Sequence, residues 1–227
     1  YYSLKETLKS HSATVLVGDE GGFAPSFYSN ADAFKILEEA ITKAGYKLGL
    51  DVFFSVDVAA SNFKQGDTYR IKDKPVPLTA DELIDFYITL NEQYHLLSIE
   101  DGIDQDDWEG WKHLTQKLGA DTQIVGDDLI TTNPQRLAKA VSEKACNATI
   151  IKPNQIGTIS DSLTVVSEAK KANFKVVVSH RSGETNDDFI ADFAVGVQAE
   201  YVKFGAPARG ERVAKYNRLL EIEHELS

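Results

Sequence analysis

The chain has 227 residues, of which 42% are hydrophobic and 26% charged, which is enough to build a folded domain with a buried core. Its net charge of −11 disfavours nucleic-acid binding, because that binding neutralises phosphates with Lys and Arg. A single cysteine excludes an intrachain disulfide, and no apolar run approaches the roughly 20 residues that span a bilayer. We therefore expect no direct nucleic-acid binding, no membrane insertion and a cytoplasmic location.

Short apolar runs alternate with longer helical patterns, and no linker or low-complexity tract divides them. The runs are often β-branched, which is typical of buried parallel strands. In chain order, the seven predicted strands are Ala13–Val17, Val52–Val56, Leu96–Ile99, Gln123–Val125, Ala148–Ile151, Lys175–Val178 and Tyr201–Lys203.

Helical patterns fill the intervals and carry start signals. Thr79 is followed by Glu82 in a capping-box pattern, and Asn133 precedes a proline at the first helical position. The predicted helices start near Asn30, Thr79, Asn133, Thr158, Asp187 and Ala208.

Strands that alternate with helices indicate βαβ units and a parallel sheet. Two α/β architectures fit this pattern: a TIM-like (β/α)8 barrel, which needs eight strands, and an open doubly wound sheet. No G-x-G-x-x-G or P-loop pattern is present, so the usual nucleotide-binding form of the open sheet lacks its signature. The polar residues at the strand ends favour the barrel, incomplete in this chain with seven strands.

An ionisable residue follows each predicted strand at or near its C-terminal end. In a barrel these ends open on one face, where barrel active sites lie. One such residue would usually be structural, but one after every strand predicts a shared cavity. The residues are Glu20, Asp57, Glu100, Asp127, Lys152, His180 and Lys203.

Three of these residues, Asp57, Glu100 and Asp127, are carboxylates from successive strands. Carboxylates that converge repel one another unless a cation lies among them. Hard oxygen ligands suit Mg²⁺, and no cysteine pair or H-E-x-x-H pattern points to zinc. The alternative is that these carboxylates cap helices or pair with lysines, and the residues alone leave both interpretations open.

The cationic residues allow further chemistry. If Lys152 and Lys203 lie together near a metal, each lowers the pKa of the other and one can serve as a base; the alternative is a pair of salt bridges to the carboxylates. Arg181 and Ser182, on a glycine-bearing turn after His180, can grip a phosphate. A serine hydrolase is disfavoured because no G-x-S-x-G elbow is present.

These segments resemble the enolase family, in the family's order and over nearly the whole chain. The matching runs are Val17–Pro25, Asp57–Ser61, Ser98–Asp101, Gly126–Leu129, Lys152–Thr158, Ser179–Thr185 and Lys203–Pro207. The resemblance implies that residues 1–227 are the enolase C-terminal barrel domain. It also implies that the family's N-terminal α+β lid domain and one barrel strand lie outside this sequence.

The resemblance implies a Mg²⁺-dependent lyase, phosphopyruvate hydratase, that dehydrates 2-phosphoglycerate to phosphoenolpyruvate in glycolysis and runs the reverse reaction in gluconeogenesis. Lys152 would be the base that removes the proton beside the carboxylate, and Glu20 the acid that helps hydroxide leave. The implied Mg²⁺ ligands are Asp57, Glu100 and Asp127. The implied substrate-binding residues are Glu20, Glu100, Asp127, Lys152, His180, Arg181, Ser182 and Lys203.

Other readings of the same resemblance stay open. A member of the same superfamily could act on a different carboxylate. The family is also reported at cell surfaces, bound to plasminogen, and in RNA-degrading assemblies. For the full-length form we expect a homo-oligomer, a dimer or octamer, and for residues 1–227 alone we expect little or no dehydratase activity.

Overall fold

A curved parallel sheet forms the centre of the chain, and a computed structural model describes all of its residues, 1–227. The six strands lie in the order β1-β4-β5-β6-β7-β8, and every neighbouring pair is parallel. Because spatial order follows chain order, the sheet has no switch point of the doubly wound kind. The predicted barrel architecture is therefore confirmed. The strands are β1 (Ser55–Asp57), β4 (Ser98–Glu100), β5 (Gln123–Gly126), β6 (Ala148–Ile151), β7 (Lys175–Ser179) and β8 (Tyr201–Lys203).

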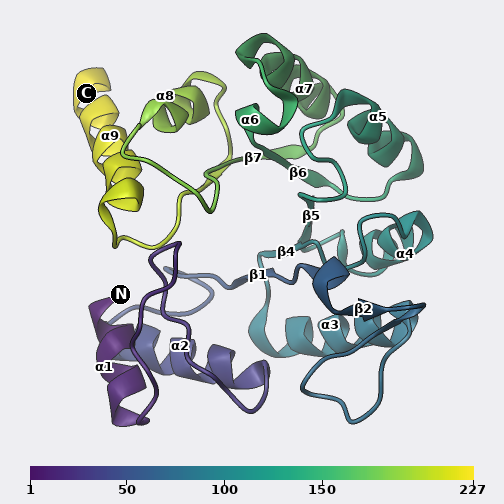
Figure 1. The fold of residues 1–227 in the computed structure, drawn as a ribbon, viewed down its shortest axis with the longest axis vertical. Helices are drawn as coiled ribbons and strands as arrows, with labels where there is room; N and C mark the ends of the chain where they lie inside the picture. The colour runs from purple at the N-terminus through teal and green to yellow at the C-terminus, as the bar shows by residue number, and fades with distance from the viewer.

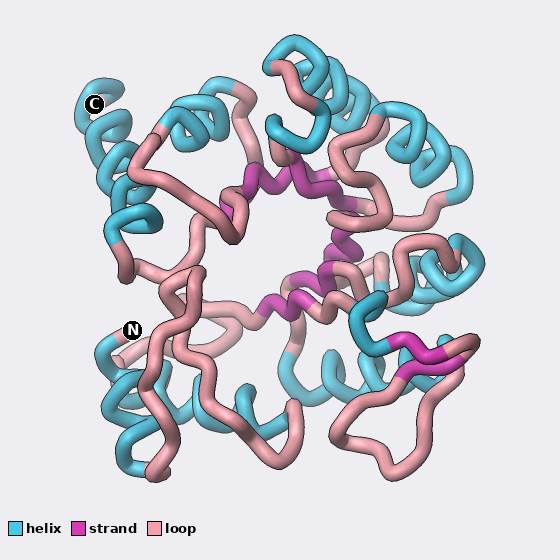
Figure 2. The backbone as a smooth tube through the Cα atoms, viewed as in Figure 1, coloured by secondary structure: helices cyan, strands magenta, loops and turns pink.

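Helices surround the sheet on its outer side, and the strands curl around a central space (Figures 1 and 2). A separate antiparallel hairpin, β2 (Lys64–Gln65) with β3 (Thr68–Tyr69), lies beside them. The helices are α1 (Tyr2–Ser10), α2 (Ala31–Lys43), η1 (Ala60–Phe63), α3 (Ala80–Tyr94), α4 (Trp108–Leu118), α5 (Pro134–Glu143), α6 (Pro153–Ile156), α7 (Ile159–Lys171), α8 (Phe189–Gly196) and α9 (Gly210–Leu226). None of them is both long and apolar enough to cross a membrane.

The helix starts agree with the sequence signals. Thr79 accepts a hydrogen bond from the backbone N–H of Glu82, whose carboxylate accepts one from the N–H of Thr79, so the capping box is confirmed. Asn133 caps α5 and Thr158 caps α7 through their side chains. Four helices, α1, η1, α4 and α6, were not among the predicted ones.

The core lies between the sheet and the helices. Alternate strand residues face it, among them Ile99, Ile124 and Val176, all completely buried. The intervening residues face the inside of the curved sheet, where Val125 and Ile150 belong to a separate small cluster. The C-terminal ends of the strands are thereby held on a rigid, two-sided framework.

The first predicted strand, Ala13–Val17, is wrong. Only one isolated bridge forms there, between Val17 and Phe23, and Leu16 is 75% exposed. The backbone of this run bonds within its own loop, where the N–H of Ala24 donates to the carbonyl of Leu16. A run with strand-like composition has formed no strand because its hydrogen bonds are made locally. The sheet therefore has six strands, and the second predicted strand begins at Ser55 rather than Val52.

Candidate active site

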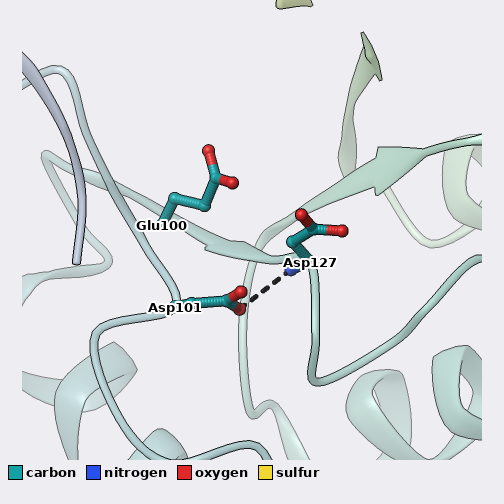
Figure 3. A group of neighbouring side chains, drawn as sticks. All are labelled: Glu100, Asp101 and Asp127. Carbon is teal, nitrogen blue, oxygen red and sulfur yellow. Dashed lines mark hydrogen bonds between the residues drawn. The ribbon is translucent and has the colours of Figure 1, made fainter. Parts of the chain in front are cut away.

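Acidic side chains meet at the C-terminal ends of β4 and β5. Oxygen atoms of Glu100, Asp101 and Asp127 all lie within 4.8 Å of one another, and Figure 3 shows the three carboxylates gathered around one region. Glu100 and Asp127 are only 8% and 6% exposed. The predicted convergence of these two residues is observed.

Asp101 is a member of this group that sequence reasoning missed as a site residue. Its carboxylate accepts hydrogen bonds from the backbone N–H groups of Asp127 and Asp128, each at 3.0 Å. The dashed line in Figure 3 marks the bond to Asp127. Asp101 therefore fixes the backbone after β5 and sets the position of the Asp127 side chain. Its place directly after Glu100 was the only signal in the sequence.

Asp57, the third predicted acid, reaches the group through a lysine. Strand register places Asp57 opposite Glu100. The ammonium of Lys203, from the end of β8, lies 2.6 Å from a carboxylate oxygen of each of them. Lys152, after β6, pairs with Asp127 in the same way. Both predicted lysines are thus brought to the predicted acids, in the salt bridges that the sequence left open.

Burial gives these groups unusual proton affinities. Burial raises the pKa of Glu100 to about 8, with the charges of Asp57 and Asp127 adding to the rise and Lys203 opposing it. Burial also raises the pKa of Asp101 to about 7. For Lys203, burial acts to lower the pKa, but the charges and hydrogen bonds of Glu100 and Asp57 raise it well above the ordinary lysine value. Lys203 is therefore in the salt-bridge arrangement that the sequence left open, with its pKa raised rather than lowered.

The acidic group is suited to a hard cation. One oxygen of Asp127, Oδ1, is buried and has no hydrogen-bond partner, while Oδ2 pairs with Lys152. A buried carboxylate oxygen without a donor is costly, and a cation would remove that cost. Because all donors are carboxylate oxygens, the set fits Mg²⁺ better than a thiophilic metal.

A second group of site residues lies where the loop after α1 meets the loop after β7. We call the space between this group and the acids of β4 and β5 the opening. The Glu20 carboxylate lies 3.4 Å from Nε2 of His180 and accepts a hydrogen bond from the Ser182 hydroxyl at 3.4 Å. The guanidinium of Arg181 donates to the side chain of Asn154 in α6 at 3.0 Å. Glu20, His180 and Ser182 therefore come together, and Arg181 lies at the rim beside them.

Two glycines permit the loop that carries Glu20 to lie directly against the chain after β8. A Cβ at Gly205 would lie 2.6 Å from the carbonyl oxygen of Glu20, and one at Gly21 would lie 2.6 Å from that of Ala208. Both glycines also have positive φ, at +86° and +83°, where other residues are strained. The chain after β8 can therefore pack directly on the loop that carries Glu20.

Buried cations on α9 are a second feature that sequence reasoning missed. Arg212 and Lys215 are almost completely buried and bond to the loop after β7. Lys215 pairs with Glu184 at 2.7 Å, and Glu184 also accepts from the backbone N–H of Arg181 at 2.8 Å. Their signal is only that they stand three positions apart on an amphipathic helix, which does not distinguish them from surface residues.

Fold and site together define an α/β barrel protein that collects carboxylates and lysines at the C-terminal ends of its strands. Residues 1–227 match the family described as "Enolase, C-terminal TIM barrel domain". The chain is 49% identical over 226 residues to the enolase of Natranaerobius thermophilus, and this alignment covers 100% of the chain and 53% of that protein. The chain therefore belongs to the enolase family, in its C-terminal TIM barrel domain. It spans about half the length of the curated relative it matches.

Proposed function

We propose that the full-length protein catalyses the Mg²⁺-dependent dehydration of 2-phosphoglycerate to phosphoenolpyruvate, and the reverse reaction. The observation that carries the proposal is the pairing at the strand ends, where Lys152 contacts Asp127 and Lys203 contacts both Asp57 and Glu100. Family membership supports it independently.

The carboxylates provide the proposed metal site. Asp57, Glu100 and Asp127 would hold Mg²⁺, with Asp127 supplying the unpartnered oxygen. The ion, when bound, supplies positive charge that stabilises the negative charge developing on the substrate carboxylate. Asp101 keeps the backbone of Asp127 in place through its hydrogen bonds.

The two lysines have different roles in the proposal. Lys203 would act as the fixed cation that favours the enolate, since its ammonium lies 2.6 Å from a carboxylate oxygen of both Asp57 and Glu100. Lys152 is the remaining lysine at the strand ends, and its Nζ would take the proton from the carbon beside the carboxylate.

The opposite side of the opening would handle the leaving group and the phosphate. Glu20 would donate a proton to the departing hydroxide, since its carboxylate faces the opening beside His180. The guanidinium fork of Arg181 and the hydroxyl of Ser182 would hold the phosphate. Substrate between the two sides would meet the base from the end of β6 and the acid from the loop after α1.

The proposal is tested by mixing the purified full-length protein with 2-phosphoglycerate and measuring phosphoenolpyruvate by its ultraviolet absorbance. We expect turnover with Mg²⁺, loss of turnover with a chelator, and recovery when Mg²⁺ is restored. Glycerate without phosphate serves as the control substrate. A protein that ignores 2-phosphoglycerate but eliminates water from an unphosphorylated acid would refute the proposal and favour a different superfamily reaction.

Residues 1–227 alone provide a second test. We expect this chain to show little or no dehydratase activity, because closure and water exclusion would need the rest of the protein. Mixing the 227-residue chain with substrate and Mg²⁺ at the same concentrations measures this directly. Turnover at the rate of the full-length protein would contradict the proposed need for the rest of the protein.

A further inference from the structure

Arg212 on α9 is a buried cation that forms no ion pair with a carboxylate. It is 1% exposed, and its hydrogen bonds all go to carbonyl oxygens and one imidazole. A buried charge without an opposite charge is expensive, and only a full set of hydrogen bonds offsets the cost. The acceptors are His180 Nδ1 at 2.8 Å, Arg181 O at 2.7 Å, Ser182 O at 2.7 Å and Asp19 O at 3.0 Å.

These bonds join the two loops that carry the acid and the histidine. Asp19 directly precedes Glu20, while Ser182 and the ring of His180 belong to the loop after β7. Gly205 allows the arrangement, since a Cβ there would lie 3.0 Å from the Arg212 side chain and 2.6 Å from the Glu20 carbonyl oxygen. One guanidinium therefore sets the spacing between Glu20 and His180.

The same guanidinium selects the tautomer of His180. Arginine has only donors and stays protonated, so Nδ1 of His180 must accept, and the ring proton lies on Nε2. Nε2 is buried, has no hydrogen-bond partner, and faces the Glu20 carboxylate at 3.4 Å. A buried N–H without an acceptor is costly unless something binds there. The Nε2–H therefore lies beside the Glu20 carboxylate without a hydrogen bond, and an oxygen of a bound ligand can accept it.

Burial and the neighbouring cations favour the neutral form of the ring. Burial lowers the pKa of His180, the charges of Arg212 and Lys203 lower it further, and those of Glu20 and Glu184 oppose the fall. A protonated ring would also turn an Nδ1–H toward the guanidinium of Arg212, replacing a hydrogen bond by a repulsive contact.

We propose that Arg212 is a positioning residue that holds His180 as a neutral Nε2–H donor in fixed register with Glu20. The donor would bind an oxygen of the phosphorylated hydroxy acid on the side where Glu20 acts. The inference rests on the proposed function for the identity of that ligand, but its statement about the tautomer does not.

The first experiment is ¹⁵N NMR of the full-length protein labelled at histidine, with the His180 signals assigned by their loss in His180→Gln. At neutral pH without substrate we expect a protonated Nε2 and an unprotonated Nδ1. A proton on Nδ1, or on both nitrogens, would overturn the inference. Because wild-type protein is measured, this result does not depend on any Arg212 variant folding.

The second experiment compares Arg212→Met and Arg212→Lys with Arg218→Gln. Arg218 is a matched control because it lies on the same helix but pairs with Asp192 in α8, away from the site. We expect Arg212→Met to lower kcat about a hundredfold with a much smaller change in KM. Arg212→Lys should recover part of the loss, and Arg218→Gln should keep wild-type kcat.

Equal kcat in folded Arg212→Met and wild type would overturn the positioning role. The outcomes also separate this inference from the proposed function. The expected tautomer in a protein that ignores 2-phosphoglycerate would refute only the proposed function. Turnover of 2-phosphoglycerate by a protein whose His180 carries its proton on Nδ1 would refute only the inference.

Discussion

The acids at the strand ends differ in how they are held. On the side of β4 and β5, Glu100 and Asp127 are buried. They lie at the C-terminal ends of strands that are hydrogen-bonded to a neighbouring strand on both edges. On the side of β1 and the loop after α1, the side chains of Asp57 and Glu20 are 45% and 47% exposed. The same residue types therefore experience different dielectric surroundings within one site.

The difference shows that one fold can control the acids of a single site by two means, burial for some and ion pairs or hydrogen bonds for others. Buried acids have their proton affinity set by desolvation, as the raised pKa of Glu100 shows. Exposed acids are instead held by ion pairs and hydrogen bonds. Lys203 pairs with Asp57, and Arg212 donates to the carbonyl of Asp19, the residue before Glu20. Both of these residues are cations from the last part of the chain, β8 and α9; Arg212 is buried and Lys203 is partly buried.

The substitution with the largest expected effect is at Asp127, among the buried acids. Asp127→Asn removes the carboxylate that pairs with Lys152 and has the unpartnered Oδ1. We expect Mg²⁺ affinity to fall by more than about a hundredfold. Loss of a residue that only contacts a metal ligand already costs up to about a hundredfold, and Asp127 is itself a proposed ligand. Isothermal titration with Mg²⁺ measures it, and Asp121→Asn, an exposed aspartate just before β5, is the control. Unchanged affinity in Asp127→Asn would remove this residue from the proposed metal site.

A core substitution tests the framework under the buried side. Ile124 on β5 is completely buried and lies opposite Ile99 of β4, so Ile124→Ala should lower the free energy of unfolding by about 2–5 kcal/mol through lost contacts and a cavity. Urea denaturation followed by circular dichroism gives the value. A loss below about 1 kcal/mol would mean that β5 is not the rigid support described above.

Glu184→Gln tests the tether between α9 and the loop after β7. The change removes the negative charge beside the buried Lys215, which keeps its hydrogen bond to the carbonyl of Thr185 and has a neutral amide in place of the carboxylate. We expect a loss of about 2 kcal/mol, below the usual cost of breaking a buried pair. The midpoint of urea unfolding at neutral pH measures it. An unchanged midpoint would show that the pair does not hold the loop.

The Glu184–Lys215 pair predicts how the stability of the protein depends on pH. Burial acts to raise the pKa of Glu184, but the hydrogen bond and charge of Lys215 bring it below the ordinary value. A folded-state pKa below the unfolded one stabilises the protein above the unfolded pKa, and this stabilisation is lost as pH falls through the folded value. The advantage of wild type over Glu184→Gln should therefore shrink in acid. A stability advantage that grows as pH falls would contradict this prediction.

The smallest expected effect concerns the exposed side. Leu16→Ala, in the run that forms no strand, should change stability by less than about 0.5 kcal/mol because the side chain is mostly in water. Measured beside Ile124→Ala under the same conditions, it quantifies the contrast between the two sides. Similar losses in both variants would contradict that contrast.

Sequence patterns predicted the parts of this molecule that depend on local signals. The capping box at Thr79 and the alternation of strands with helices are examples, and the acids of β4 and β5 converge because parallel strands end on one face. Ala13–Val17 failed because strand-like composition does not reveal where a backbone finds its hydrogen bonds.

Residues whose state depends on distant partners could not be predicted. Arg212 is buried by carbonyls of loops far away in the chain, and nothing around it on α9 marks it as different from an exposed arginine. The raised pKa of Lys203 likewise depends on two acids from other strands, whose charges outweigh the effect of burial.

Lys152→Ala in the full-length protein, assayed for exchange of the substrate C2 proton with solvent deuterium, tests the central claim most directly. If Lys152 is the base at these strand ends, exchange should fall by about 10²–10⁴-fold. Mg²⁺ affinity should not fall, because the carboxylates of Asp57, Glu100 and Asp127 remain. Exchange that survives the substitution would contradict the account.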